Sequence, residues 1–331
     1  MWTQLYAVAR NAFVEAVRQP FFIVWLFTIM FALCVGPFLA AYTFSDDNKL
    51  ASDYGLSSQL IGGLVLAAFA ASGVVSREIE DKTALTVISK PLARPIFVVG
   101  KYLGVAAALA LAWWVWTLVY LLALRQGAFS NVGIPWDAPV LIFGGLAITL
   151  GIGIGLALNY FFRKPFGSTA AFWLAILLPI AVIAAAPFDE HFAAEPNGEL
   201  LDPAQWLAVF MIFQATMLFA AVAVTCSTRL GQASTLAIML VVFLLGLTSD
   251  YAFGRQLNDA VEQGTAVPFW ARVGYAATPN LQYHWLGDAI SQGTVTNIGP
   301  GFVGLVSAYT LVLIVGVLGL AVALFQTRNA A

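Results

Sequence analysis

The sequence predicts an all-α, polytopic membrane protein with about eight transmembrane helices and an N-terminal amphipathic elbow helix. Of the 331 residues, 61% are hydrophobic and only 10% are charged, whereas soluble domains carry about 25% charged residues. The apolar runs are about 20 residues long, which is enough for a helix to cross about 30 Å of hydrocarbon. They lack the alternating ten-residue pattern of membrane β-barrels. We therefore expect residues 1–331 to form a single transmembrane domain.

Residues 1–20 are amphipathic. Apolar residues recur at helical spacing from Trp2 to Val17, while Arg10, Glu15 and Arg18 take the other face. This pattern predicts an interfacial helix that lies in the headgroup layer until the chain turns into the membrane at Pro20. An ordinary soluble amphipathic helix is the alternative, and the apolar run that follows at once disfavours it.

Eight apolar runs follow this segment, separated by polar linkers. Small residues in the second and fourth runs predict close helix packing, or local flexibility in the fourth. The turn between the sixth and seventh runs is short enough that this pair could instead be a re-entrant hairpin. The approximate ranges are 21–41, 56–76, 102–124, 138–162, 168–187, 206–225, 235–248 and 302–325.

The distribution of cations predicts the orientation. Eight spans leave Lys49, Arg125, Arg255 and Arg272 on one side and a larger group on the other. The larger group is Arg10, Arg18, Arg77, Lys82, Lys90, Arg94, Lys101, Arg163, Lys164, Arg229 and Arg328. Short loops rich in Lys and Arg stay in the cytoplasm. We therefore expect cytoplasmic N- and C-termini and a cytoplasmic loop at 77–101.

Residues 77–95 hold the densest group of charges in the chain, four cations and three anions. Such a stretch cannot lie in lipid and must meet water. Leu85 and Ile88 offer an apolar patch that a partner could bury, Thr83 can cap a helix, and Pro91 and Pro95 limit its end. The residues alone leave a second interpretation open, a solubilising loop whose charges pair with each other.

Several function classes are disfavoured. No ionisable residue lies inside a predicted span, which argues against proton- or sodium-coupled carriers and ion pumps. The sequence Gly100-Lys101 lacks the other residues of a phosphate-binding loop, so ATP would be hydrolysed by another chain. Ser72 between Ala71 and Gly73 is interpreted as part of a packing patch, because no histidine is available at membrane depth to activate it. His191 and His284 fall in external loops and are expected to be solvated.

The loop at 77–101 resembles the cytoplasmic loop of type-2 ABC transporter permeases. That family links its second and third spans by an E-x-E-x-x-T segment, a P-x-x-R and a following lysine. The matching residues are Glu78, Glu80, Thr83, Pro91, Arg94 and Lys101. Residues 224–234 resemble the serine-rich turn between two late spans of the family, and 277–293 resemble its external segment. The family commonly has six spans, so the pair at 138–187 departs from its pattern.

The resemblance implies the transmembrane permease subunit of an ATP-driven ABC exporter. Two cytoplasmic ABC ATPase subunits would dock on a coupling helix in the loop, which adds Leu85 and Ile88 to the six matching residues as ATPase-coupling positions. The permease would form a homodimer or pair with a similar permease, among the lipids of a bacterial inner membrane. The chain itself is expected to hold no catalytic residue, cofactor or metal and to bind no nucleic acid. The substrate could be lipid-like or amphipathic.

Two rival functions and one structural alternative remain. A membrane enzyme or assembly factor without an ATPase would use Asp189, Glu190, His191 and Asp288, whose spacing matches no metal or acid–base motif. A non-ABC channel or carrier is disfavoured by the uncharged spans. The external segment 249–300 is rich in aromatic anchors and is expected to form either short helices on the membrane surface or a simple loop.

Overall fold

The protein is an all-α bundle. The computed structural model describes residues 2–40, 47–76, 93–127, 136–194, 198–292, 294 and 298–326. Within these ranges there are no strands, and eight helices are long and apolar enough to cross a membrane. The predicted fold class is therefore confirmed.

The observed helices follow the predicted order. α9 and α10 are each long and apolar enough to cross a membrane, as two full spans require, although the turn between them is as short as the sequence indicated. The helices before residue 150 are α1 (Trp2–Arg18), α2 (Pro20–Ala40), α3 (Asp47–Ala71), the π-helical turn η1 (Ser72–Ser76), α6 (Arg94–Gln126), the π-helical turn η3 (Val140–Gly144) and α7 (Gly145–Phe162). The later ones are α8 (Phe166–Ala185), η4 (Gly198–Leu201), α9 (Pro203–Ser227), α10 (Gln232–Ser249), η5 (Asp250–Gly254), α11 (Arg255–Glu262), α12 (Phe269–Ala277), η6 (Gln282–His284), α13 (Gly287–Ser291) and α14 (Pro300–Gln326).

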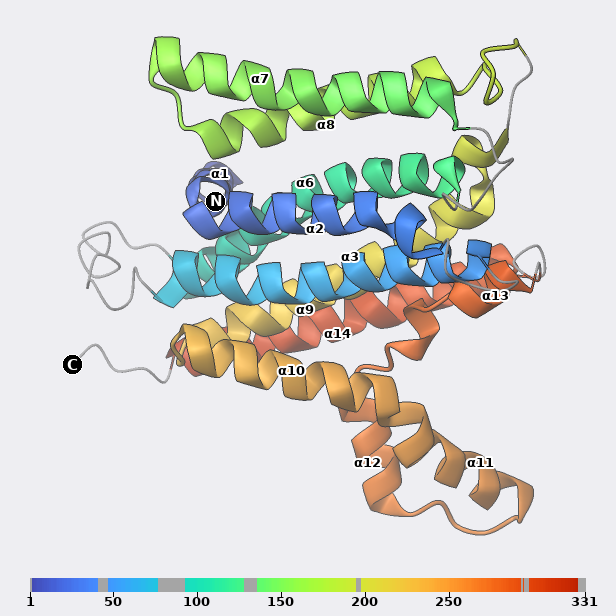
Figure 1. Cartoon of the computed structure of the whole chain (residues 1–331). Coiled ribbons are helices and arrows are strands. Elements are labelled where there is room, and N and C mark those ends of the chain that lie inside the picture. Colours follow the sequence, from blue (N-terminus) through green and yellow to red (C-terminus); the bar gives the residue numbers. More distant parts are fainter. Residues whose placement is uncertain are drawn as a thin grey trace.

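The spans run side by side, and α1 lies across them (Figure 1). We call the end of the bundle where η1 finishes and α6 begins the loop end, because residues 77–92 connect these two elements there. The turn between α7 and α8 and the end of α14 lie at the same end (Figure 1). The crossing angle of α1 agrees with the interfacial helix predicted for residues 1–20.

Helix α6 is the hub of the bundle. It packs against α1, α2, α3, α8, α9 and α14. Three of its indoles each donate a hydrogen bond to a backbone carbonyl of a different neighbour, which gives each indole N–H an acceptor within the bundle. These bonds run from Trp113 to Val209 in α9, from Trp114 to Ala175 in α8 and from Trp116 to Leu26 in α2.

The core is formed by α3, α6 and α9, whereas α7, α10 and α14 expose most of their apolar surface. Small residues permit the close approach of α3. A Cβ atom on Gly63 would lie 2.7 Å from Oγ1 of Thr216 in α9, and one on Gly55 would overlap the ring of Tyr120 in α6. The close packing predicted for the second span is therefore confirmed.

The fourth span uses only some of its glycines for packing. Gly151 and Gly155 lie against Leu174 and Ala170 of α8, one helical turn apart. A Cβ atom on Gly153 would meet no neighbouring atom within 4 Å. The α7–α8 pair is an outer layer of the bundle that touches the hub through α8 (Figure 1).

Helix α6 is longer than the predicted span at 102–124. Its 33 residues reach about 50 Å and take in Lys101 near one end and Arg125 near the other. Both cations lie outside the predicted span, in the parts by which the observed helix exceeds it. About 36 Å separates the two cations along the axis, more than the 30 Å of a hydrocarbon core, so each falls near a membrane interface.

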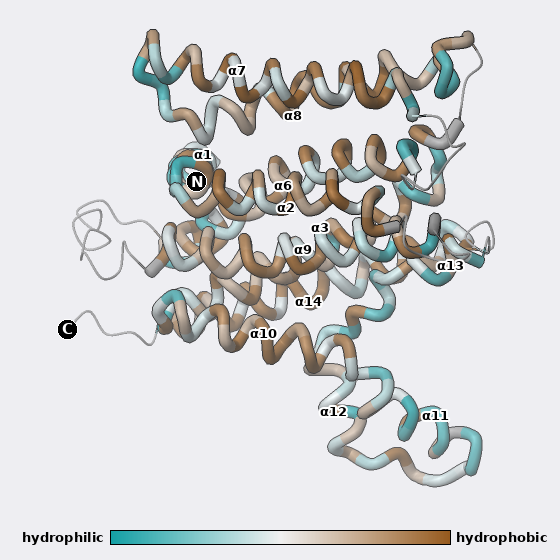
Figure 2. Tube along the Cα trace, viewed as in Figure 1, coloured by the Kyte–Doolittle hydropathy of each residue, from teal (hydrophilic) through white to brown (hydrophobic). Residues whose placement is uncertain are grey.

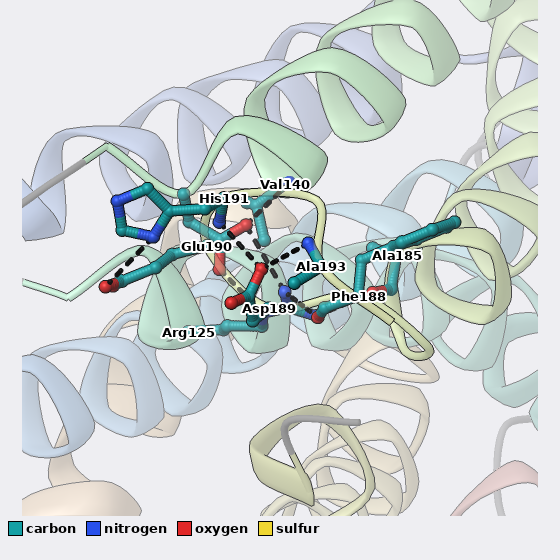
Figure 3. A network of polar contacts seen from close by, with 9 residues as sticks. Arg125, Val140, Ala185, Phe188, Asp189, Glu190, His191 and Ala193 are labelled. Carbon is teal, nitrogen blue, oxygen red and sulfur yellow. Dashed lines mark hydrogen bonds and ion pairs between the residues drawn. The ribbon is translucent and has the colours of Figure 1, made fainter. Parts of the chain in front are cut away.

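Arg125 is buried at the far end of α6, although the sequence placed it in an external loop. Its Nε donates to Asp137 Oδ2 at 2.7 Å, and its Nη1 and Nη2 donate to the carbonyls of Ala185 and Phe188 at 2.9 and 2.8 Å (Figure 3). The other carboxylate oxygen of Asp137 accepts from the Val140 amide. One ion pair thus fastens the ends of α6 and α8 and the start of η3.

The external segment 249–300 contains short helices, so the simple-loop alternative is wrong. The turn η5 and helices α11 and α12 lead away from the spans and are more hydrophilic than them (Figures 1 and 2). The chain then returns to the bundle, where the Leu281 amide donates to the Gly246 carbonyl at 3.1 Å.

His284 is buried in this returning segment, which corrects the expectation of a solvated side chain. Its Nε2 lies 2.9 Å from Thr310 Oγ1 of α14. Because that hydroxyl also donates to the Val306 carbonyl, the ring nitrogen is the donor of the shared bond. Burial lowers the pKa of His284 to about 4, and the Asn280 backbone opposes this shift. His191 is exposed, as expected.

Candidate functional site

The predicted coupling residues divide into two groups. Arg94 and Lys101 lie in the first two turns of α6, at the loop end. The other six lie outside the described residues; they are Glu78, Glu80, Thr83, Leu85, Ile88 and Pro91. The structure therefore defines the base from which the loop departs, and it is this base that we describe.

The start of α6 follows from its sequence. Ala93 has an extended conformation, and Pro95 occupies the first turn of the helix. Proline is favoured there because its missing N–H would have no partner in the helix and its φ is already helical. Pro95, which the sequence suggested as the end of a coupling helix, thus belongs to the beginning of α6.

Lys101 joins the two elements that flank the loop. Its Nζ donates to the Val74 carbonyl of η1 at 3.2 Å and lies 3.5 Å from Glu15 Oε2 of α1. Only 2% of the residue is exposed. The last turn before the loop, the helix after it and the interfacial helix therefore meet at one ammonium group.

The same turns of α6 hold the end of α14. The ring of Phe97 stacks on Phe325 at 5.3 Å between centroids, and Lys101 Nζ lies 5.6 Å from the Phe97 centroid. Such a cation–π contact is attractive because the ring face is negative. Arg94 Nη1 donates to the Gln326 carbonyl at 3.0 Å. Cations favour helix C-termini, where carbonyls lack helical partners.

A second arginine binds the end of α14. Arg229, in the turn between α9 and α10, donates to the Leu324 carbonyl from Nε at 3.1 Å and from Nη2 at 2.6 Å. This turn belongs to the serine-rich segment that the sequence singled out at 224–234. It thus connects α9 and α10 to the same helix end that Arg94 contacts.

Helix α1 rests directly on the backbone of α6. A Cβ atom on Gly104 would lie 2.5 Å from the Ala9 carbonyl oxygen and 2.8 Å from the Phe13 amide nitrogen. One turn earlier, a Cβ atom on Gly100 would lie 2.7 Å from the Val8 side chain. A side chain at position 104 would meet the backbone of α1 and push the helices apart, whereas one at position 100 would have to displace the Val8 side chain.

The turn η1 is also fixed on its other side. Ser72 Oγ lies 3.2 Å from Ser227 Oγ of α9, and both residues are buried. This agrees with the interpretation of Ser72 as part of a packing patch. The side chain of Gln19, between α1 and α2, lies against Gly73.

The residues considered for an enzyme have local structural partners. Asp189 Oδ1 accepts from the amides of His191 and Ala193 at 2.9 and 2.7 Å, and Glu190 Oε1 lies 3.5 Å from His191 Nδ1 (Figure 3). Asp288 instead pairs with Lys49 of α3 at 3.2 Å. Asp189 thus closes a turn after α8, while Asp288 binds α13 to α3.

Sequence reasoning missed three participants in this base, namely Glu15, Phe97 and the pair Gly100 and Gly104. The glycine spacing was a usable signal, because two glycines four residues apart form one face of a helix on which another helix can pack. Glu15 had no such signal, since it is an ordinary polar residue on an amphipathic helix.

The comparisons with known proteins give a family for most of the chain. The family described as "ABC-2 family transporter protein" matches residues 17–230, which is more than half of the chain. No curated protein matches the sequence. The matched region includes the loop, α6 and the α7–α8 pair, and it ends in the turn that holds Arg229.

Proposed function

Since the chain belongs to the ABC-2 transporter family, we propose that it is the transmembrane permease subunit of an ATP-driven exporter. A separate cytoplasmic ABC ATPase would dock on residues 77–92 and hydrolyse ATP. Its closure would move the loop, and the loop would move the spans. The cargo would be lipid-like or amphipathic, in keeping with uncharged span interiors.

The base of the loop is the observation that carries this proposal. Val74, before the loop, and Lys101, after it, are joined by a hydrogen bond of 3.2 Å. A force on the loop therefore acts on α3 and α6 together, and both belong to the core of the bundle. A loop that served only solubility would not need a hydrogen bond that joins its two ends.

The positions of the described cations support a cytoplasmic loop end, and we propose that the membrane is the inner membrane of a bacterium. The opposite end holds Lys49, Arg125, Arg255 and Arg272. The loop end holds Arg10, Arg18, Arg94, Lys101, Arg163, Lys164 and Arg229. An excess of Lys and Arg is typical of the cytoplasmic side. With this orientation the start of α1 and the end of α14 are cytoplasmic.

We further propose two permease copies, identical or similar, with two ATPase subunits. The exposed apolar faces of α10 and α14 would be covered by membrane lipid or by the second permease. The first step of the test needs only one permease and one ATPase.

The test is co-purification of the detergent-solubilised permease with each ABC ATPase subunit encoded in the same genome. We expect wild type to retain an ATPase, and the Glu78→Ala/Glu80→Ala and Leu85→Asp variants to lose it. The matched control is Glu190→Ala/Glu262→Ala, which removes two exposed carboxylates at the opposite end. Stable ATPase binding by all variants would refute docking on this loop.

A further inference from the structure

Lys101 is too deeply buried to touch a docked partner. Its 2% exposure leaves no surface for an ATPase, although the resemblance to the permease family grouped it with the residues on which an ATPase would dock. Among the described residues, its ammonium contacts the Val74 carbonyl, the Glu15 carboxylate and the face of Phe97. A role in coupling must therefore be exerted inside the permease.

We propose that Lys101 is the positioning residue of a joint that transmits movement of the loop to the interfacial helix α1 and to the end of α14. The joint consists of Glu15, Val74, Phe97, Lys101 and Phe325. This inference rests on the proposed function, because it assumes that an ATPase moves the loop. It differs in assigning Lys101 no contact with that ATPase.

The contact between α1 and α6 makes such transmission direct. Gly100 and Gly104 bring the backbones together, so the first two turns of α6 cannot move toward α1 without displacing it. Sliding along this smooth contact would remain possible if only small residues met there. The Lys101–Glu15 ion pair, at 3.5 Å, crosses the contact and fixes the register of the two helices.

The charge on Lys101 is better explained by a role in fixing the register of α1 on α6 than by a contribution to stability. Removing an ammonium from water costs several kcal/mol, and a buried pair often gains little over apolar side chains of similar size. Fixing one register among several is the best-supported use of such a pair. A methionine at 101 would fill a similar volume but would bind neither the carboxylate of Glu15 nor the carbonyl of Val74.

The same two turns of α6 also act on α14. Phe97 stacks on Phe325, and Arg94 binds the Gln326 carbonyl. Tilting these turns would therefore pull on the last span at its end. Because Lys101 also lies over the Phe97 ring, one side chain holds the orientation of both connections.

The experiment measures the distance between spin labels on α1 and α7. Tyr6→Cys and Tyr160→Cys supply the labels, since 70% and 81% of these tyrosines are exposed, and Cys34 and Cys226 are replaced by alanine. The test variants are Lys101→Met and Glu15→Gln. The matched control is Lys164→Met, an exposed lysine at the same end of the bundle (Figure 1).

The first measurement uses the permease alone in lipid nanodiscs and so does not depend on an ATPase. Lys101→Met is expected to broaden the distance distribution about twofold through local loosening of α1, and Glu15→Gln to broaden it less. Lys164→Met should match the background. A distribution of unchanged width in Lys101→Met would overturn the joint.

The second measurement adds the ATPase with ATP and vanadate. Lys101→Met is expected to bind the ATPase as wild type does but to lose most of the nucleotide-dependent shift in distance. Loss of ATPase binding equal to that of Glu78→Ala/Glu80→Ala would overturn the inference, because Lys101 would then be a docking contact. Failure of wild type to bind any ATPase would instead refute the proposed function, while the first measurement still judges the joint.

Discussion

The two ends of α6 each bury a cation, and they bury it differently. At the far end, Arg125 has a side chain of 0% exposure, and its partner Asp137 has 6%. The guanidinium binds both carboxylate oxygens, at 2.7 and 3.4 Å, and two carbonyls. At the loop end, Lys101 is 3.5 Å from Glu15, whose side chain keeps 33% of its surface exposed.

The two ends therefore differ in rigidity. We call the Arg125–Asp137 pair the lock, in contrast to the joint proposed around Lys101. A bidentate arginine–carboxylate pair with further hydrogen bonds has one geometry and is costly to break. A single ammonium on a flexible side chain, beside a partly hydrated carboxylate, keeps the register of α1 on α6 while it lets the two helices change their angle at little cost. The far end of α6 therefore holds the α7–α8 pair in place, while the loop end would allow the movement that the proposed coupling requires.

The largest expected effect is at the lock. Asp137→Ala leaves the Arg125 guanidinium buried without its carboxylate. The free energy of unfolding, measured in mixed micelles, should therefore fall by about 3–5 kcal/mol. The double variant Arg125→Met/Asp137→Leu should recover most of this loss, and Asp259→Ala, at an exposed site, should cost little. A single variant as stable as the double would mean that the pair is no lock.

The next effect concerns His284, which is buried against Thr310 of α14. Its folded pKa of about 4 lies below its ordinary value of 6.5, so the unfolded state binds a proton first as pH falls. The contribution of neutral His284 to the free energy of unfolding is fully present above pH 6.5. It is lost as the pH falls to about 4, by up to about 3 kcal/mol. Thermal unfolding as a function of pH measures this. His284→Gln should flatten that decrease, whereas His191→Gln should leave it, and an equal slope in both would contradict the assignment.

The contact of α1 with α6 comes third. Gly104→Leu inserts a side chain where the Ala9 carbonyl and the Phe13 amide already lie, and overpacking of this kind costs about 1–3 kcal/mol. Limited proteolysis should show α1 released from the bundle. Gly153→Leu is the matched control, because it faces open space, and comparable release by that variant would show a general defect.

The smallest effect on stability is expected at the joint. Lys101→Met removes the charge together with its need for a partner, so unfolding should change by less than about 1 kcal/mol. Arg125→Met, which strands the Asp137 carboxylate, should cost several times more in the same assay. Equal losses at both positions would erase the distinction between lock and joint.

Much of the fold could be predicted from the sequence, because the properties that decide it are local or additive. The length of an apolar run decides whether it spans, as in α2 and α14. The amphipathic period of residues 2–18 predicted α1, and small residues predicted the packing of α3. A sum over Lys and Arg residues also gives an orientation without any knowledge of contacts, and that orientation stays a prediction.

The candidate site was predicted only in outline. The loop at 77–101 was identified by its charges and by its resemblance to a family that a match over residues 17–230 then supported. The sequence of the loop could not tell whether Lys101 faces a partner or the interior of the bundle. Val74 lies 27 residues before Lys101, and Glu15 lies in another helix, so nothing near position 101 records them.

What the sequence determined by itself is that this chain spans a membrane as a bundle of helices with a charged loop between the second and third spans. Only the tertiary structure decided which charges are buried. The burial of Arg125, Lys101 and His284 depends on acceptors supplied by other helices. The free energy of transferring an apolar run out of water depends on that run alone. The free energy of burying a charge depends on the partners that other helices supply.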